Sequence, residues 1–244
     1  MKILINIFIL LSLISCTKGL SSKKVLFVVT SHSELGTTGK KTGAYITEVT
    51  HPYHVLIEKG VQIDIASPEG GKTPLDGLDQ ADEITKALLK NDTFLNKLNN
   101  AKKLSDLNPT DYDAIYFAGG HGTMFDLPDN PDVQRLTASI YDNGGIVSAV
   151  CHGPVALVNV KLKNGKYLVE NKNVASFTNE EEEAMKLTNQ MPFLLESKLI
   201  ERGGKFTKSE NFTEHVVTSD RLITGQNPAS AKEVGERILK QLAK

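Results

Sequence analysis

Apolar positions in this chain form short runs that alternate with longer amphipathic stretches. Four runs are rich in apolar, β-branched or small side chains: residues 25–29, 61–66, 114–118 and 146–150. Such short apolar runs are typical of strands buried inside a parallel sheet. The stretches between and after them predict helices over residues 43–59, 81–89, 132–143 and 229–242. Weaker strand patterns follow at residues 174–177, 216–217 and 222–223.

Strands that alternate with helices predict a single α/β domain with a doubly wound, mostly parallel sheet flanked by helices, of the flavodoxin-like kind. Thr42 is a suitable cap for the first helix and Gly60 a suitable stop. Ligands of such sheets bind at the carboxyl ends of the strands. The loop 31–42, the loop 119–122 and Cys151 all follow predicted strands, so we expect them at that edge.

Cys151 stands where the strand 146–150 ends, and His152, Gly153 and Pro154 follow it. A strand, a sharp turn at a nucleophile and a helix-compatible segment form the layout of a nucleophile elbow. We predict that the turn places the sulfur near a helix N-terminus, where unpaired N–H groups favour thiolate over thiol. An isolated cysteine is more often a buried structural residue, but the turn, the histidine and the glycine together indicate a reactive thiol.

The composition fits one large domain, because the chain has 244 residues, of which 40% are hydrophobic and 23% charged. Its formal net charge of −1 offers no electrostatic reason to expect a nucleic-acid partner. The glycines of residues 119–122 do not form a dinucleotide fingerprint. His51 and His54 lack a carboxylate partner set for a metal. We therefore expect no cofactor and no metal.

The N-terminal residues have a different character. Lys2 precedes an apolar stretch over residues 3–14, which is too short to span a bilayer as a mature helix and has the layout of a secretory signal. Residues 13–16 resemble the lipobox of bacterial lipoproteins. The resemblance implies a signal peptide over residues 1–15, acylation of Cys16, a lipid-anchored tether over 16–22 and a domain over 23–244. We expect an exported, membrane-anchored protein; a cleaved but unlipidated signal and a cytoplasmic protein are the alternatives.

Six sequence blocks occur in order between residues 23 and 242. They are Thr30–Ser31; Lys41–Gly43 with Glu48 and His51–Pro52; Gly119–Asp126; Ala149–Pro154; Phe177–Asn179 with Glu182; and Thr224–Ser230. These blocks resemble the ThiJ/PfpI superfamily, whose fold is related to that of class I glutamine amidotransferases. The chain looks most similar to the glutathione-independent glyoxalases (glyoxalase III), a branch that includes stress-induced holding chaperones. The blocks are less specific for activity, because the superfamily is chemically diverse.

The resemblance implies roles for individual residues. Cys151 matches the nucleophile, His152 its neighbouring base, and Glu182 the carboxylate that orients the histidine, although any of residues 180–183 can be the partner. Glu48 matches the acidic residue that approaches the sulfur from the first helix. The loop that would hold an oxyanion or the substrate consists of Gly119, Gly120 and His121, although His121 can also simply anchor the loop through a hydrogen bond.

The implied reaction is that of a cofactor-independent lyase, a glyoxalase III or D-lactate dehydratase, acting on methylglyoxal and related 2-oxoaldehydes. The thiolate of Cys151 adds to the aldehyde and forms a hemithioacetal. Glu48 or His152 then moves a proton from C1 toward C2 through an enediol. Water hydrolyses the resulting thioester to a 2-hydroxy acid.

Other functions remain open at this point. A cysteine-dependent deglycase or peptidase-type hydrolase can use the same thiolate, and a holding chaperone or redox stress protein needs no catalysis. An amidotransferase of this fold needs a late His-x-Glu pair, which is absent around the only late histidine, His215. Because relatives are often homodimers, the resemblance also implies a homodimer.

Overall fold

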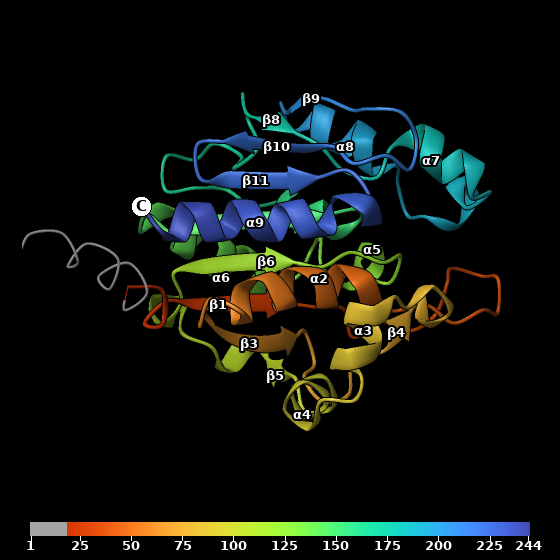
Figure 1. The fold of residues 1–244 in the computed structure, drawn as a ribbon. Helices are drawn as coiled ribbons and strands as arrows, with labels where there is room; N and C mark the ends of the chain where they lie inside the picture. The colour runs from red at the N-terminus through yellow and green to blue at the C-terminus, as the bar shows by residue number, and fades with distance from the viewer. Residues whose placement is uncertain (1–18) are drawn as a thin grey trace, which may run out of the picture.

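A seven-stranded sheet forms the centre of the molecule, for which a computed structural model describes residues 19–244 (Figure 1). The strands, in spatial order, are β10 (Val216–Ser219), β11 (Leu222–Gly225), β7 (Ile146–Val150), β6 (Ala114–Phe117), β1 (Lys24–Val28), β3 (Gln62–Ser67) and β5 (Lys102–Lys103). Every neighbouring pair is parallel except β10 with β11, which is antiparallel. The predicted doubly wound, mostly parallel sheet is therefore confirmed.

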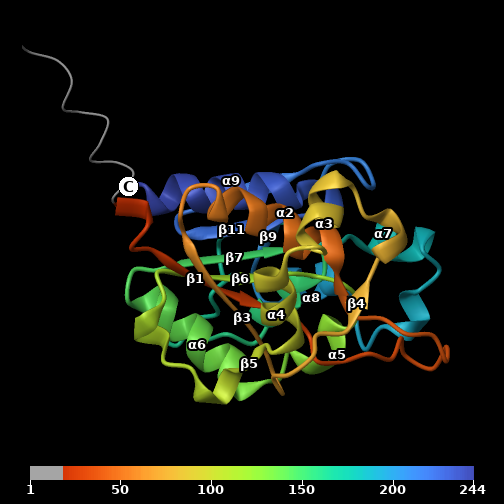
Figure 2. The same cartoon turned by 60° about the horizontal axis from the view of Figure 1, so that its bottom comes forward.

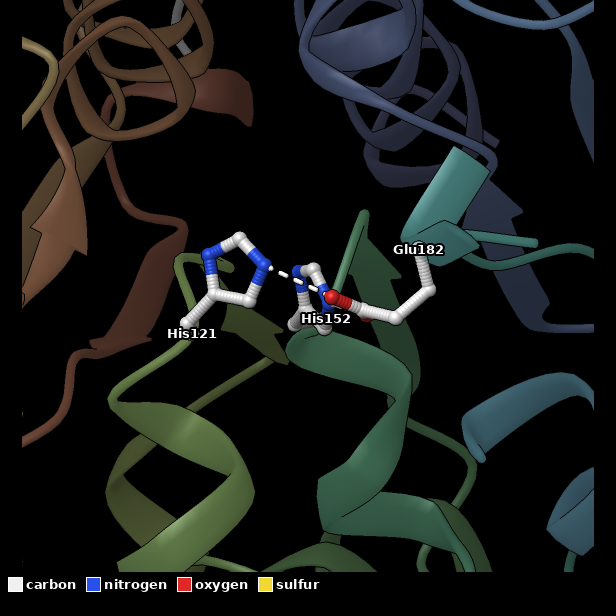
Figure 3. A group of neighbouring side chains, drawn as sticks. All are labelled: His121, His152 and Glu182. Carbon is white, nitrogen blue, oxygen red and sulfur yellow. Dashed lines mark hydrogen bonds and ion pairs between the residues drawn. The ribbon is translucent and has the colours of Figure 1, made fainter. Parts of the chain in front are cut away.

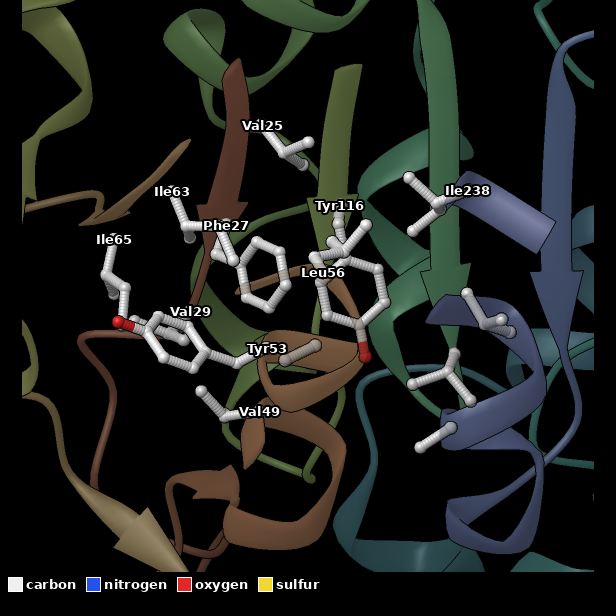
Figure 4. Close-up of a cluster of buried hydrophobic side chains, with 14 of the residues drawn as sticks. Val25, Phe27, Val29, Val49, Tyr53, Leu56, Ile63, Ile65, Tyr116 and Ile238 are labelled. Carbon is white, nitrogen blue, oxygen red and sulfur yellow. The ribbon is translucent and has the colours of Figure 1, made fainter. Parts of the chain in front are cut away.

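The two faces of the sheet bury different side chains of the same strand. In β1, Val25 and Phe27 belong to the hydrophobic cluster under α2 (Ile46–Ile57) and α9 (Ala231–Leu242), whereas Leu26 and Val28 belong to the opposite cluster. This alternation follows from the two-residue period of a strand. Figure 4 shows the first cluster, in which Phe27 lies between the rings of Tyr53 and Tyr116.

Helices cover both faces (Figures 1 and 2). The first cluster also contains side chains of α3 (Glu83–Leu88) and α4 (Asp92–Asn99), and the second contains side chains of α5 (Thr123–Asp126), α6 (Pro131–Asp142) and α8 (Leu195–Glu201). α2 and α9 pack closely because α9 carries Gly235, where an added Cβ would lie 2.8 Å from the Cα of Pro52.

Two short strand pairs and one short helix lie beside the main sheet. β2 (Ala44–Tyr45) pairs with β4 (Leu75–Asp76), and β8 (Asn173–Val174) pairs with β9 (Lys205–Phe206). α7 (Asn179–Ala184) follows β8 and is capped at its start by Thr178. These additions lie near the carboxyl ends of the central strands, where the candidate site is found.

The structure corrects three local predictions. The first helix begins at Ile46 rather than at residue 43, because the Thr42 hydroxyl donates to Asp76 instead of capping the helix. The segment 90–109, for which no helix or strand was predicted, contains α4 and β5. The strand predicted over residues 174–177 is β8, which ends at Val174 and lies outside the main sheet.

No helix within residues 19–244 is long and apolar enough to cross a membrane. The predicted signal over residues 1–15 and the predicted acylation of Cys16 fall outside the described residues, so both stay predictions.

Candidate active site

Cys151 occupies a strained backbone position at the end of β7. Its φ angle is 59°, in the left-handed region that non-glycine residues rarely adopt. The turn is held from both sides, because the Cys151 N–H donates to the carbonyl of Gly225 at 3.0 Å and its carbonyl accepts from Phe177 at 2.8 Å. An added Cβ at Gly153 would lie 2.3 Å from the Phe117 carbonyl oxygen, so the elbow requires glycine there. The predicted sharp turn is present.

The segment after the elbow differs from the expectation. A 3₁₀ helix over Gly153–Leu157 follows the cysteine, in place of a regular α-helix. A single short turn supplies little of the dipole that a longer helix would direct at the sulfur. Burial raises the pKa of the Cys151 thiol well above its usual value, and the Glu48 charge beside it also raises this pKa. The expected preference for thiolate is therefore not found, and Cys151 rests as the thiol.

His152 connects the thiol to a carboxylate. Its Nδ1 lies 3.3 Å from the Cys151 sulfur and its Nε2 lies 2.7 Å from Oε2 of Glu182. An ionised carboxylate can only accept hydrogen bonds, so in the neutral ring Nε2 carries the proton and Nδ1 presents its lone pair to the thiol. Burial and the neighbouring His121 lower the pKa of His152, and although Glu182 raises it, the result is about 4, so the ring is neutral at pH 7.

The carboxylate partner of His152 is Glu182, and the choice left open within residues 180–183 is settled by how α7 begins. Glu181 is turned into the protein as part of a capping box with Thr178, and Glu180 pairs with Lys208 near the surface. Glu182 faces the histidine. Burial raises the pKa of Glu182, but the hydrogen bonds from His121 and His152 outweigh burial and bring it to about 2.

His121 shares this carboxylate. Its Nε2 lies 3.1 Å from Oε1 of Glu182, while His152 occupies the other oxygen. Figure 3 shows the two imidazoles, from the loops after β6 and β7, directed at one carboxylate from α7. The hydrogen bond anchors the loop that carries His121, as the simpler interpretation of this residue predicted.

Glu48 reaches the site from α2 and is fully buried. Its Oε2 accepts the N–H of Gly119 at 2.7 Å, and the carboxyl lies beside the Cys151 sulfur. Oε1 is buried without a nitrogen or oxygen hydrogen-bond partner in the described part of the chain. Burial raises the pKa of Glu48 to about 8, although its contacts with Cys151 and Gly119 act in the opposite direction. Glu48 is therefore protonated at neutral pH and can donate a proton at the sulfur.

The N–H groups of Gly119 and Gly120, in the loop after β6, have different partners. The Gly119 N–H is occupied by Glu48, so it is not free to bind an oxyanion. Gly120 has a φ angle of 98°, and an added Cβ there would lie 2.2 Å from the Gly43 carbonyl oxygen. Its N–H points at the Cys151 sulfur and lowers the pKa of that thiol. Of the two glycines predicted in this loop, Gly120 is the one whose N–H is available next to the Cys151 sulfur.

Two residues support the site in ways that the sequence did not predict. The Phe177 ring lies 4.5 Å from the His152 ring and covers it. Glu181 is fully buried and accepts hydrogen bonds from four groups, which are the N–H of Thr178, the N–H of Phe212 and the side-chain amides of Gln226 and Asn227. The Thr-x-x-Glu spacing of Thr178 and Glu181 is a capping-box signal that was visible in the sequence.

The fold and the elbow define an α/β protein with a buried cysteine at the carboxyl edge of a parallel sheet. The model of the DJ-1/PfpI family matches residues 41–241, so the chain belongs to this family. The recognition of the ThiJ/PfpI superfamily from the sequence is confirmed.

Similar proteins include named glyoxalases. Glyoxalase 3 of Candida albicans is 38% identical over 235 residues, which cover 88% of this chain and 97% of the relative. The glutathione-independent glyoxalase HSP31 of Saccharomyces cerevisiae is 31% identical, with 91% and 99% covered. The crystal structure of glyoxalase III from Candida albicans has a TM-score of 0.82 at 34% identity, covering 90% of this chain and 97% of that chain. Rapid Encystment Protein 24 kDa of Francisella tularensis has a TM-score of 0.87 at 40% identity, covering 90% and 99%.

Proposed function

We propose that this protein is a glutathione-independent glyoxalase that converts methylglyoxal and related 2-oxoaldehydes to 2-hydroxy acids. The observation that carries the proposal is a single sulfur with two different proton-transfer groups beside it. Neutral His152 can accept a proton from Cys151, and protonated Glu48 can donate one. Groups whose pKa values are displaced in this way are typical of acid and base pairs in active sites. The named relatives support the same activity.

In the first step the sulfur of Cys151 bonds to the aldehyde carbon C1. The thiol proton passes to Nδ1 of His152, and the resulting imidazolium is stabilised by Glu182. The aldehyde oxygen gains the electron pair of the broken π bond and takes the proton of Glu48. The product is a neutral hemithioacetal, with Glu48 left as a carboxylate beside it.

In the second step the Glu48 carboxylate removes the proton on C1, which gives an enediolate whose C2 oxygen receives the proton held by His152. Glu48 returns its proton to C2 and then accepts the proton of the C1 hydroxyl, whose oxygen becomes the thioester carbonyl. Glu48 is thus protonated again and His152 is neutral. One carbon is oxidised and its neighbour is reduced, so the exchange is internal and consumes no external redox partner.

In the last step water attacks the thioester, which releases the 2-hydroxy acid and restores the thiol. The N–H of Gly120 lies on the sulfur side of the loop and is the donor that we assign to the developing oxyanion, together with the backbone after Cys151. His152 is again the base within reach, in this step for the water.

The test is turnover by the purified protein with methylglyoxal as the only substrate and no thiol added. Disappearance of methylglyoxal and formation of lactate, followed with stereospecific lactate dehydrogenases, are the expected result and also identify the product stereoisomer. No lactate above the rate of the heat-inactivated protein would contradict the proposal.

We further propose that the protein is exported and held at a membrane through acylated Cys16, on the strength of the apolar stretch and lipobox pattern in residues 3–16. A homodimer is expected by resemblance to the superfamily, and light scattering of the purified protein measures it.

A further inference from the structure

The oxygens of Glu182 and the imidazoles of His121 and His152 form a convergent set of metal-ligating atoms. One ligand atom from each residue lies within 4.8 Å of the other two. Figure 3 shows both rings directed at the carboxylate from different loops. Two imidazole nitrogens and one carboxylate oxygen are a ligand set that zinc uses in proteins, with a fourth position left for water.

The three residues are also held in place by the fold, and a metal ion can reach them from solvent. Glu182 is held by α7, and His152 follows the elbow directly, so both have fixed backbones. The His121 side chain is the most accessible of the three, with 14% of its surface exposed against 1% for His152 and 6% for Glu182. A metal ion can therefore arrive from the side of His121.

We propose that zinc binds to His121, His152 and Glu182 and inhibits the enzyme. The inhibition rests on the proposed function, whereas the binding does not. Zinc takes the lone pair of Nε2 of His152, and the proton of that nitrogen moves to Nδ1. Nδ1 then faces the Cys151 sulfur with a proton in place of a lone pair, so it can no longer accept the thiol proton. The negative charge of Glu182 then partly offsets that of the metal and is no longer available to stabilise a protonated His152.

An alternative zinc site, centred on Cys151, must be distinguished from the proposed one. The Cys151 sulfur is a soft ligand and lies next to the Glu48 carboxyl, so a cysteine-centred site is the main competitor. The two sites share no ligand. Cys151→Ser removes the sulfur and leaves all three proposed ligands, whereas His121→Asn removes one proposed ligand and leaves the sulfur.

The experiment titrates the purified full chain with zinc chloride against a chromophoric chelator, in buffer without thiols, and measures methylglyoxal turnover in parallel. We expect one zinc per chain, loss of turnover as the site fills, and recovery with EDTA. Cys151→Ser is expected to keep the zinc affinity. His121→Asn is expected to weaken it by more than about 10-fold, since even second-shell changes cost about 10–100-fold.

His51→Asn is the matched control, because His51 is a partly exposed histidine paired with Asp82 and is not one of the three proposed ligands. It should keep the wild-type affinity. Loss of zinc binding in Cys151→Ser with retention in His121→Asn would overturn the proposal, as would the absence of stoichiometric binding. Zinc binding without any methylglyoxal turnover would contradict the proposed function alone, whereas turnover unaffected by bound zinc would contradict only the inhibition.

Discussion

In the proposed mechanism the side chain of Cys151 depends on its neighbours for reactivity, because its own surroundings oppose ionisation. The thiol is almost completely buried and its pKa is raised by that burial. A group in such a place reacts fast only when a base takes its proton as the bond forms. Nδ1 of His152, at 3.3 Å, is placed to do so.

Replacement of Cys151 by serine tests this dependence. Serine is close to cysteine in volume but far less nucleophilic, so we expect no measurable methylglyoxal turnover in Cys151→Ser and an unchanged melting temperature. Stopped assays for lactate and thermal unfolding followed by circular dichroism measure both. A variant that retained most of its activity would exclude the covalent mechanism.

Burial of Glu48 has a useful effect, because it keeps the carboxyl protonated and able to donate a proton. Its pKa of about 8 leaves it protonated at neutral pH, and it loses the proton as the pH rises through that value. Turnover of the wild-type protein should therefore fall above about pH 8. It should also fall toward pH 4, where His152 becomes protonated and can no longer accept the thiol proton.

Glu48→Gln separates the two limbs of this pH profile. Loss of the titrating proton should reduce turnover by about 10²–10⁴-fold, the usual contribution of a positioned acid or base. The residual activity should lack the alkaline limb while keeping the acid limb that belongs to His152. An unchanged rate, or an alkaline limb at the same pH in the variant, would remove Glu48 from the mechanism.

At the scale of the element, three successive glutamates of α7 contact three different parts of the protein. Glu180 lies at the surface, Glu181 holds the loop and amides around Phe212, Gln226 and Asn227, and Glu182 orients His152. Successive residues of a helix are about 100° apart around its axis, so they face different neighbours. One short helix therefore carries both a residue that holds the surrounding loops, Glu181, and a residue that contacts His152, Glu182.

Substitution of each glutamate by glutamine should separate these tasks. Glu182→Gln should lower kcat by about 10²–10⁴-fold, the usual contribution of a positioned base, because His152 would lose the carboxylate that fixes its orientation and tautomer. Glu181→Gln should lower the free energy of unfolding by about 2–4 kcal/mol, since it disrupts several charge-assisted hydrogen bonds of a buried group. Glu180→Gln is the control and should change neither quantity. Chemical denaturation and steady-state kinetics of the three variants measure these effects. Full activity in Glu182→Gln would contradict the role of Glu182 in orienting His152.

At the scale of the whole molecule, the parallel sheet assembles the site from distant segments. β6 and β7 are adjacent, so the loops that carry His121 and Cys151 emerge side by side at one edge. α2 packs over the same region of the sheet and brings Glu48 to the sulfur. No short stretch of the chain contains enough of the site to work alone.

The location of the whole molecule is tested at Cys16. Several acyl chains anchor a protein stably where one chain does not, since each buried CH₂ contributes about 0.8 kcal/mol. The mature protein should therefore sediment with membranes and carry acyl mass on Cys16. Cys16→Ala should lack the acyl label while Cys151 still reacts with alkylating reagents. An unmodified chain beginning at Met1 in a soluble fraction would contradict both export and lipidation, without affecting the enzyme assignment.

Local patterns in the sequence were sufficient for the main strands, the doubly wound topology and the elbow at Cys151. The strand 146–150 could be predicted because a buried parallel strand needs a continuous apolar run, and the elbow because small residues surround the turn. The helix α4 was missed because its segment is mostly polar, although two local signals mark it. Asn91 caps it by accepting the Phe94 N–H, and Phe94 and Leu98, four residues apart, are buried on one face.

The sequence by itself determined the fold class, the family resemblance and the sharp turn at Cys151, because each of these depends on neighbouring residues along the chain. Only the tertiary structure decided that Glu182 rather than its neighbours meets His152, and that the Gly119 N–H serves Glu48. These contacts join residues 30 and 71 positions apart. The displaced pKa values of Glu48, His152 and Glu182 also belong to the folded state, because burial and the approach of distant charges cause them.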